Sequence, residues 1–343
     1  MSWSGQHRFR LPADWEPQEA VWFAWPASEN LWPGVLPRVR RQLAKLYQLA
    51  ARYEKVCLLC PAAAQADFLS HLEAVGSASH IELFDYATDD VWCRDFGPIF
   101  VFDRETAALT ATDWGFNAWG EKFPAYQRDA SAPAFIAEQL GVPRITFDFV
   151  LEGGAIDSNG AGSLLTTEAV LLHPNRNGRN DKVAMEAYLA QGLGVEQVLW
   201  LQEGLVGDDT DGHIDNVARF FREDGLLLAC TEDATHPNAA HLEESRLGLE
   251  GAVLPDGRSI EKILLPLPDP IFAEGQLLAA SYLNYLVLNG AVLVPTYGQA
   301  KKDAQAIKVL AGCYPGRKVI GFDARDFLLE GGSLHCLSQH QPR

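Results

Sequence analysis

The chain has little positive charge for its length. Its 343 residues include 28 lysine and arginine residues against 45 aspartate and glutamate residues, which gives a formal net charge of −17. A surface of this sign repels the phosphates of nucleic acids and the headgroups of anionic membranes, so neither is expected as a partner. The charge is compatible with a small cationic molecule, although many acidic proteins carry it only for solubility.

Long apolar runs are also missing. No stretch reaches the roughly 20 apolar residues that cross a bilayer as a helix, so no transmembrane helix is expected. Residues 1–8 contain no apolar run behind a basic start, which excludes a secretory signal in this segment.

Cysteine is sparse, with six residues in the whole chain. Sparse cysteine without a secretory signal is typical of a reducing compartment, and we expect a cytoplasmic protein. Cys57 and Cys60 have the spacing of redox and zinc motifs, but a second pair is missing and both lie in an apolar run. We therefore predict that both are packed in the core.

No linker rich in proline, serine or charge interrupts the chain, so we expect one domain over residues 1–343. Units of two strands, a helix and a further strand recur at intervals of roughly 60 to 80 residues, which predicts an α/β fold with internal repeats. The expected helices are 38–53, 64–75, 182–193, 236–249 and 301–310. The expected strands are 56–59, 81–84, 98–102, 170–172, 197–201, 217–221, 226–230, 263–265, 291–295 and 318–321, and 217–221 forms a hairpin with 226–230.

The sharpest local feature lies near the end of the chain, where Gly331 and Gly332 precede Cys336. Glycines allow a tight backbone bend that exposes the residues after it. A cysteine in such a place can be reached by a ligand, and its thiolate is a strong nucleophile. Taken alone, however, a buried core cysteine is the simpler interpretation.

An acidic loop at residues 207–216 surrounds His213 with four aspartates. His213 and Asp215 are two residues apart, so they face the same side of an extended segment. Such a pair can supply an acid or base and an anion for a cationic substrate. Calcium binding is the rival interpretation, but the glutamate of the EF-hand spacing is absent.

Two further motifs contain carboxylates. Trp92 and Asp95 are three residues apart, and they can stack on and pair with a planar cation or belong to an ordinary surface turn. Glu152 lies in a Leu-Glu-Gly-Gly sequence that returns at residues 329–332. By itself, this sequence indicates only a turn.

Together, these motifs resemble agmatine deiminases and the related bacterial peptidylarginine deiminases, which belong to the guanidine-modifying superfamily. The resemblance runs in order from residue 10 to the end of the chain. It is carried by residues 11–17, 25–26, 92–98, 151–154, 164–168, 174–177, 210–216, 280–284 and 331–336.

The resemblance implies a role for each matching residue. Cys336 would attack the guanidinium carbon, and His213 would protonate the departing ammonia and later activate water. Asp95 and Asp215 would hold the guanidinium nitrogens, with Glu152 beside the histidine. The other implied substrate contacts are Trp92, which stacks on the guanidinium plane, Trp119, Asn284 and Gly332.

The resemblance also implies a fold and a reaction. The fold is a five-bladed α/β propeller of ββαβ-type units around a pseudo-fivefold axis, with the active site in the central channel. A covalent thiouronium forms and is hydrolysed to a ureido product, without a metal or organic cofactor. The oligomeric state stays open, with a homo-oligomer as one alternative.

The substrate expected from the sequence is agmatine. A site for arginine needs a cation to receive the α-carboxylate, usually an arginine fork. Residues 113–120 follow the tryptophan motif and contain no arginine, and Asp208, Asp209 and Asp211 suit an ammonium better than a carboxylate. Deimination of peptidyl or free arginine is the alternative, and a catalytically silent guanidine-binding protein on the same fold is a more remote one.

The aromatic residues of the 113–120 segment have a second explanation. Trp114, Phe116 and Trp119 can line the substrate pocket, or they can simply pack in the core.

Overall fold

The computed structural model describes residues 7–178 and 181–343. Residues 1–6 lie outside this part, so most of the segment in which no secretory signal is expected lies outside it too. Within the described ranges, no helix is long and apolar enough to cross a membrane.

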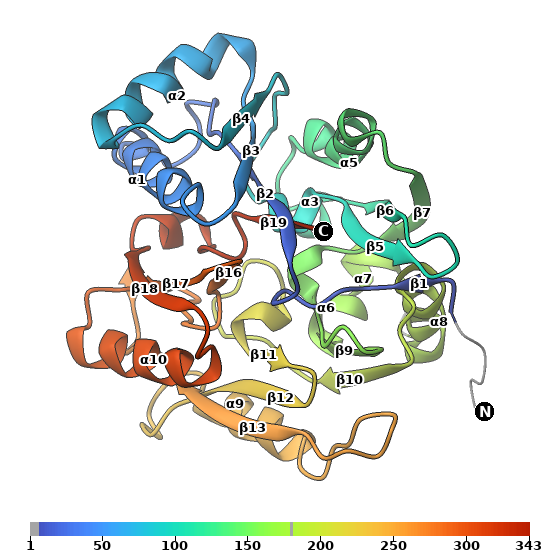
Figure 1. The fold of residues 1–343 in the computed structure, drawn as a ribbon. Helices are drawn as coiled ribbons and strands as arrows, with labels where there is room; N and C mark the ends of the chain where they lie inside the picture. The colour runs from blue at the N-terminus through green and yellow to red at the C-terminus, as the bar shows by residue number, and fades with distance from the viewer. Residues whose placement is uncertain (1–6, 179–180) are drawn as a thin grey trace.

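Five sheets of three or four strands make up most of the β-structure in the described part of the chain (Figure 1). In spatial order, the two four-stranded sheets contain β19 (Gln339–Pro342), β2 (Gln18–Ala24), β3 (Lys55–Leu59) and β4 (Ile81–Phe84), and β1 (Phe9–Arg10), β5 (Ile99–Asp103), β6 (Leu109–Gly115) and β7 (Arg144–Val150). The first three-stranded sheet contains β8 (Ile156–Ser158), β9 (Ser163–Thr167) and β10 (Gln197–Leu201). The other two contain β11 (Ala218–Arg222), β12 (Gly225–Cys230) and β13 (Glu261–Pro266), and β16 (Leu286–Leu288), β17 (Ala291–Thr296) and β18 (Lys318–Asp323). A small ribbon contains β14 (Phe272–Ala273) and β15 (Gln276–Leu277).

The five sheets share one pairing scheme. Each contains an antiparallel pair, and one strand of this pair also has a parallel neighbour. Parallel neighbours need a crossover connection, and a long helix lies in each of these connections. These helices are α1 (Leu36–Ala50), α5 (Gln127–Leu140), α8 (Lys182–Leu193), α9 (Ala239–Gly248) and α10 (Ala300–Cys313).

Figure 1 shows the sheets following one another around the middle of the molecule in chain order, with the long helices towards the outside. A further helix, α2 (Ala62–Val75), joins β3 to β4. The last strand, β19, pairs with β2, so the two ends of the chain contribute to one sheet. The sequence therefore folds as a mixed α/β protein with a repeated unit.

The helices follow from apolar spacing and end signals. In α1, the buried side chains of Val39, Leu43, Leu46 and Ala50 recur every three or four residues and lie on one face. At the start of α8, the Asp181 side chain accepts a hydrogen bond from a backbone N–H of the first turn, and Gly194 ends the helix in the left-handed conformation. The five expected helices are confirmed as α1, α2, α8, α9 and α10.

The expected strands are confirmed with one exception. The apolar residues 170–172 do not form a strand; the strand is β9, and α6 (Glu168–Leu171) follows it. The polar residues of β9 can be buried because Thr166 and Thr167 donate their hydroxyls to backbone carbonyls. Thr167 also caps α6, so the apolar residues after it continue as a helical turn.

The core contains two apolar clusters. Cys57 and Cys60 belong to the larger one and are fully buried, as predicted. Burial raises the pKa of each thiol to about 12, so neither suits redox or zinc chemistry.

Candidate active site

Short helical turns bring the predicted site residues together. Asp95 lies in α3 (Cys93–Phe96), and Asp215 lies in the 3-10 turn η2 (Ile214–Asn216). Glu152 directly precedes the turn η1 (Gly153–Ala155), and His213 directly precedes η2. Cys336 follows the turn η3 (Phe327–Glu330), and α3, η1 and η2 pack on one another.

Two glycines allow this close approach. A Cβ on Gly154 would lie 2.5 Å from Nδ1 of His213 and 2.7 Å from Oδ1 of Asp95. A Cβ on Gly332 would lie 2.3 Å from the Trp92 ring. Both distances are far below van der Waals contact, so only glycine fits at these two positions.

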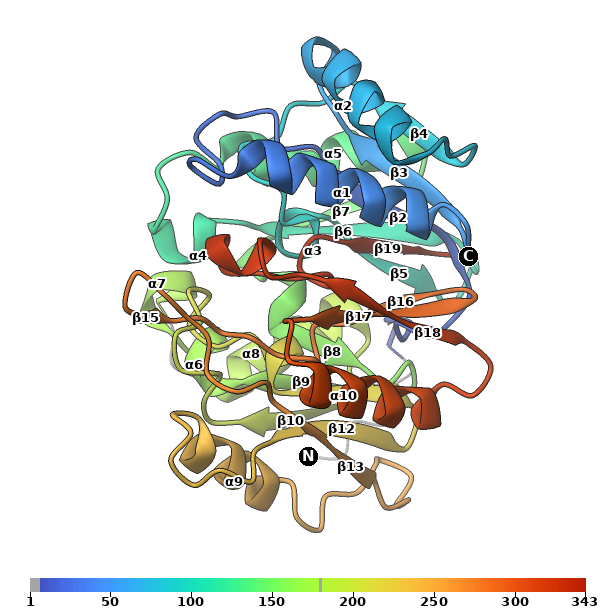
Figure 2. The same ribbon diagram turned by 90° about the vertical axis from the view of Figure 1, so that its left-hand side faces the viewer.

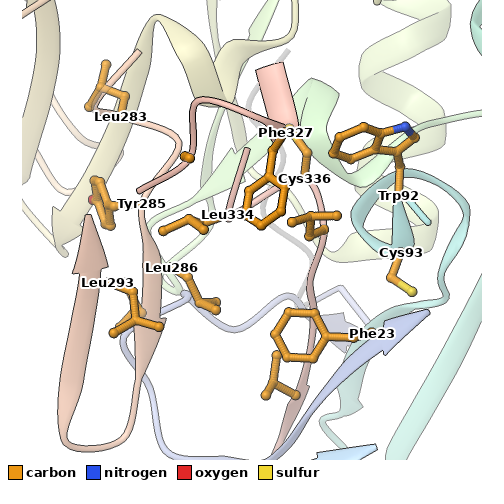
Figure 3. Close-up of a cluster of buried hydrophobic side chains, with 14 of the residues drawn as sticks. Phe23, Trp92, Cys93, Leu283, Tyr285, Leu286, Leu293, Phe327, Leu334 and Cys336 are labelled. Carbon is orange, nitrogen blue, oxygen red and sulfur yellow. The ribbon is translucent and has the colours of Figure 1, made fainter. Parts of the chain in front are cut away.

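Cys336 lies in a largely apolar environment. It belongs to the larger core cluster, with Phe327 and Leu334, and is 5% exposed (Figure 3). Its Sγ accepts a hydrogen bond from Nδ2 of Asn284 at 3.0 Å and lies 3.6 Å from Oδ2 of Asp215. Burial, together with the nearby aspartates, raises the pKa of this thiol well above its ordinary value, so the free protein holds it protonated.

Both carboxylate oxygens of Asp95 accept hydrogen bonds. Its Oδ2 accepts a hydrogen bond from Nε1 of Trp119 at 3.0 Å, and its Oδ1 accepts one from the Gly154 N–H at 3.1 Å. Burial raises the pKa of Asp95 to about 6, and the charges of Asp215 and Glu152 add to this effect. Keeping Asp95 ionised at this site therefore costs free energy, and a neighbouring cation would reduce this cost.

His213 is surrounded by carboxylates. Its Nδ1 lies 3.6 Å from Oδ1 of Asp95, and the side chain is fully buried. Burial opposes the charged ring, but Asp95, Glu152 and Asp215 outweigh it, so the pKa of His213 is raised. This environment favours the protonated histidine, which can act as an acid.

Several buried polar atoms of the site have no hydrogen-bond partner within residues 7–178 and 181–343. They are Oε2 of Glu152, Oδ1 of Asp215 and both ring nitrogens of His213. The opposite oxygens are occupied: Oε1 of Glu152 accepts from Arg176 at 2.5 Å, and Oδ2 of Asp215 contacts His335 at 2.7 Å. Buried polar atoms without partners are rare, and the two carboxylate oxygens among them indicate a place for a hydrogen-bond-donating cation.

A pocket of about 410 Å³, including its open mouth, leads to Cys336. Its apolar walls are Trp92, Trp119 and Phe123, and Gly332 lines it beside Trp92. Figure 3 shows Trp92 and Cys336 in the same cluster of side chains. An apolar slot that ends at buried carboxylates suits an alkyl chain with a cationic head.

Three acidic side chains also line this pocket: Asp90, Asp209 and Glu330. Burial raises the pKa of Asp90 to about 7, and the charge of Glu330 contributes. Burial likewise raises the pKa of Asp209 and of Glu330, and the charge of Asp209 adds to the effect on Glu330. These like charges share one space, which favours a second cationic group in the ligand.

The acidic loop contributes less to the pocket than the sequence suggests. Only Asp209 of its first three aspartates lines it. Asp208 accepts hydrogen bonds from Thr210 and from Asn216, and Asp211 forms ion pairs with Lys122 and Arg176. The expectation that Asp208 and Asp211 face an ammonium is therefore wrong, because both are already paired inside the protein.

The aromatic residues of the 113–120 segment are likewise divided between the pocket and the core. Trp119 lines the pocket, whereas Trp114 stacks on Phe147 with ring centroids 4.1 Å apart, in the second core cluster. Phe116 packs edge-on against Trp119 in the larger cluster. Core packing is therefore the correct explanation for Trp114 and Phe116.

The predicted site residues thus lie together, in two layers. Trp92, Asp95, Trp119, Gly332 and Cys336 line the pocket. The others lie beneath: Asn284 donates to both Cys336 and Asp215, and Glu152 and His213 are fully buried.

The sequence did not identify Asp90, Glu330 or His335 as functional residues. Each lies within or next to a family motif. Its position beside Trp92 or Cys336 was therefore the only sequence signal that could have identified it, because its own residue pattern indicates no chemistry. In the described residues, no group of three or more histidine, cysteine, aspartate and glutamate side chains is arranged to hold a metal ion.

A cysteine and an aspartate line the apolar slot, and they lie next to a buried histidine and Asp215. Cysteine-dependent enzymes use groups of this kind for nucleophilic and acid–base chemistry. The comparisons give the family. Residues 10–342 match the model of the Porphyromonas-type peptidyl-arginine deiminases, and the chain belongs to this family.

The relatives are similar over their full length. An agmatine deiminase of Medicago truncatula is 33% identical, covering 98% of this chain and 97% of its own. An agmatine deiminase of Pseudomonas aeruginosa is 35% identical, covering 97% and 95%. The structure of a Cys-to-Ser variant of the C. jejuni agmatine deiminase with substrate bound superposes with a TM-score of 0.89 at 32% identity, covering 100% and 98%.

Proposed function

We propose that the protein hydrolyses agmatine to N-carbamoylputrescine and ammonia through a covalent thiouronium on Cys336. The observation that carries this proposal is that Glu152, His213 and Asp215 have buried atoms without a hydrogen-bond partner in the described residues, and that Asp215 also lies 3.6 Å from Sγ of Cys336. The names of the full-length relatives support the same reaction.

Asp95 and Asp215 bind the guanidinium. Two carboxylates facing a planar cation give charge-assisted hydrogen bonds, which also fix its orientation. Trp92 covers the guanidinium plane. The guanidinium is resonance-stabilised and a poor electrophile, so holding its carbon near Sγ of Cys336 contributes an orientation gain.

Substrate binding also activates the thiol. The charges of Asp215 and Asp95 help to keep the pKa of Cys336 high in the free protein. A bound guanidinium neutralises these charges, and a protonated His213 adds further positive charge, so the thiolate forms when the substrate is in place.

The reaction then proceeds in two halves. Sγ of Cys336 bonds to the guanidinium carbon, His213 donates its proton to one nitrogen, and ammonia departs to leave the thiouronium. His213 next takes a proton from water, whose oxygen bonds to the same carbon. The C–S bond breaks while the added hydroxyl loses its remaining proton to solvent water, and the neutral ureido product leaves with the sulfur again a thiolate.

The acidic pocket wall favours agmatine over arginine. Asp90, Asp209 and Glu330 attract the distal ammonium of agmatine. An α-carboxylate at the same place would be buried among like charges. We expect arginine to be poorer by about a hundredfold in kcat/KM, which corresponds to about 2.7 kcal/mol.

The repeated pairing scheme supports a five-bladed propeller of ββαβ-type units around a pseudo-fivefold axis, with the site in the central channel. The unit of β5, β6, α5 and β7 is one such blade. In this arrangement, residues 1–343 form a single catalytic domain, and each blade turns a short loop towards the common centre.

A substrate panel tests the proposal. Purified protein is incubated with agmatine, free arginine and an arginyl peptide, and ureido product and ammonia are measured for each. Ureido product and ammonia in equal amounts, with agmatine strongly preferred, are expected. Comparable efficiency on arginine or the peptide would refute the agmatine assignment and favour a free-arginine or peptidylarginine deiminase. Binding of agmatine without turnover would identify a silent guanidine-binding protein.

A further inference from the structure

Neighbouring residues of the site face two different cavities. Asp95 and Cys336 line the substrate pocket, whereas Arg94 and His335, which directly precede them, line a second cavity. This second cavity encloses about 540 Å³, part of it open to solvent, and shares no lining residue with the substrate pocket. Its lining includes Asp14 from the segment before β2.

A continuous series of contacts joins the thiol to this second cavity. Sγ of Cys336 lies 3.6 Å from Oδ2 of Asp215, and the same oxygen lies 2.7 Å from Nδ1 of His335. On the other side of the ring, Nε2 of His335 lies 2.9 Å from Oδ2 of Asp14. The Asp14 side chain is 19% exposed, although Asp215 and His335 are fully buried.

We propose that Asp215, His335 and Asp14 form a proton relay that carries the thiol proton of Cys336 to the second cavity when the substrate fills the pocket. The proposal rests on the proposed function, because a bound substrate fills the substrate pocket, which is the other route by which the thiol proton could reach solvent. His335 acts here as a positioning and proton-carrying residue that does not touch the substrate.

The steps balance in protons. In the starting state, Nε2 of His335 carries the ring proton and donates it to Asp14, and the unprotonated Nδ1 faces Oδ2 of Asp215. The thiol proton passes to Oδ2 of Asp215 and on to Nδ1, while the Nε2 proton passes to Asp14 and then to water in the second cavity. One proton enters and one leaves, and His335 changes only its tautomer. The cationic substrate replaces the charge of the lost proton, and a proton returns when the product leaves.

The charged groups around the His335 ring favour proton transfer through it. Burial, with the charges of Arg219 and Arg94, lowers the pKa of His335 to about 4, so the ring stays neutral and can accept at one nitrogen while donating at the other. Asp14 also faces His340 and Arg94, whose charges, with the hydrogen bonds from His335 and His340, outweigh burial and hold its pKa well below the ordinary value. It forms a further ion pair with Arg219. A carboxyl of this kind releases a proton to water rapidly instead of storing it.

The neighbouring His340 supplies a matched control. Its Nδ1 lies 3.0 Å from Oδ1 of Asp14, but its Nε2 contacts the carbonyl of Val287 at 2.8 Å. It therefore touches the same aspartate without lying between Asp14 and Asp215. His335→Gln keeps a polar group of similar reach but cannot accept and donate a proton through one ring, and His340→Gln makes the same chemical change outside the relay.

Stopped-flow mixing with saturating agmatine in weak buffer and a pH indicator measures proton release, and acid quenching with mass spectrometry measures the Cys336 adduct. In His335→Gln we expect both to slow by about tenfold or more, with KM within about twofold of wild type. In His340→Gln, which leaves the contacts between Cys336 and Asp14 in place and removes only one of the groups that lower the pKa of Asp14, we expect both rates to fall by at most about threefold. Wild-type rates in His335→Gln, or equal losses in the two variants, would overturn the relay.

The wild-type protein tests the relay without any variant, which covers the case in which His335→Gln does not fold. The rate of adduct formation is measured across mixtures of light and heavy water. Several protons moving together predict a curved dependence on the deuterium fraction, and a linear dependence would overturn the relay. Ureido product in the same samples reports on the proposed function, so the two ideas can fail separately.

Discussion

Replacing Gly154 with alanine would press directly on two of the proposed catalytic side chains. The new Cβ would lie 2.5 Å from Nδ1 of His213 and 2.7 Å from Oδ1 of Asp95. Ordinary contacts between such atoms are about 3.5 Å, so each group must move by about 0.8 to 1 Å. A displacement of this size at a catalytic group costs about a hundredfold in rate, so kcat/KM for agmatine should fall by about that factor, or about 2.7 kcal/mol.

Gly312→Ala is the matched control. Gly312 lies in α10, and a Cβ there would meet no atom within 4 Å. Alanine at this exposed helical position should raise stability by about 0.5–1 kcal/mol and leave kcat/KM unchanged. Steady-state kinetics and thermal unfolding are measured for both variants. A folded Gly154→Ala protein with wild-type kcat/KM would show that His213 and Asp95 do not need the positions described.

Four further outcomes follow from the same geometry. Cys336→Ala should abolish turnover, while calorimetry still detects agmatine binding; residual turnover would exclude this cysteine as the nucleophile. Asp95→Asn and Asp215→Asn should each cost about 1.5–3 kcal/mol in transition-state stabilisation, measured as kcat/KM; unchanged values in both would remove them from the site. Burial raises the pKa of Asp95 to about 6, and agmatine binds its ionised form, so kcat/KM should fall as the pH drops through about 6; Asp95→Asn should lose this acid limb of the profile. Asp209→Asn combined with Glu330→Gln should reduce the preference for agmatine over arginine by about tenfold; an unchanged ratio would show that the acidic wall does not select the amine.

Local sequence pattern predicted much of the fold, because many elements carry their own signals. The bounds of α8 are fixed by an aspartate cap and a terminal glycine, and residues 182–193 were predicted in full. The helix α5 was not predicted, since Pro133 interrupts its pattern and proline is normally a helix breaker. The strand β9 was misplaced because its polar residues are satisfied by backbone partners from η1 and the loop before η2, which local pattern does not reveal.

For the site, too, some features were predictable from the sequence and others depend on contacts between distant parts of the chain. The resemblance carried by the ordered motifs implied that Cys336, His213 and the carboxylates belong together. The sequence did not predict that Asp211 of the acidic loop forms ion pairs within the protein, because its partners Lys122 and Arg176 come from other parts of the chain. The contact between His335 and Asp14 spans 321 residues, and only the folded structure reveals it.

Trapping the covalent intermediate shows whether Cys336 is the nucleophile. The wild-type protein and His213→Ala, which should slow both halves of the reaction, are each mixed with agmatine labelled at the guanidine carbon, quenched in acid at a series of times and digested for mass spectrometry. Label is expected on the peptide that contains Cys336 and on no other cysteine peptide. Label on a different cysteine, or ureido product from the wild-type protein with no labelled cysteine in either protein, would contradict this assignment.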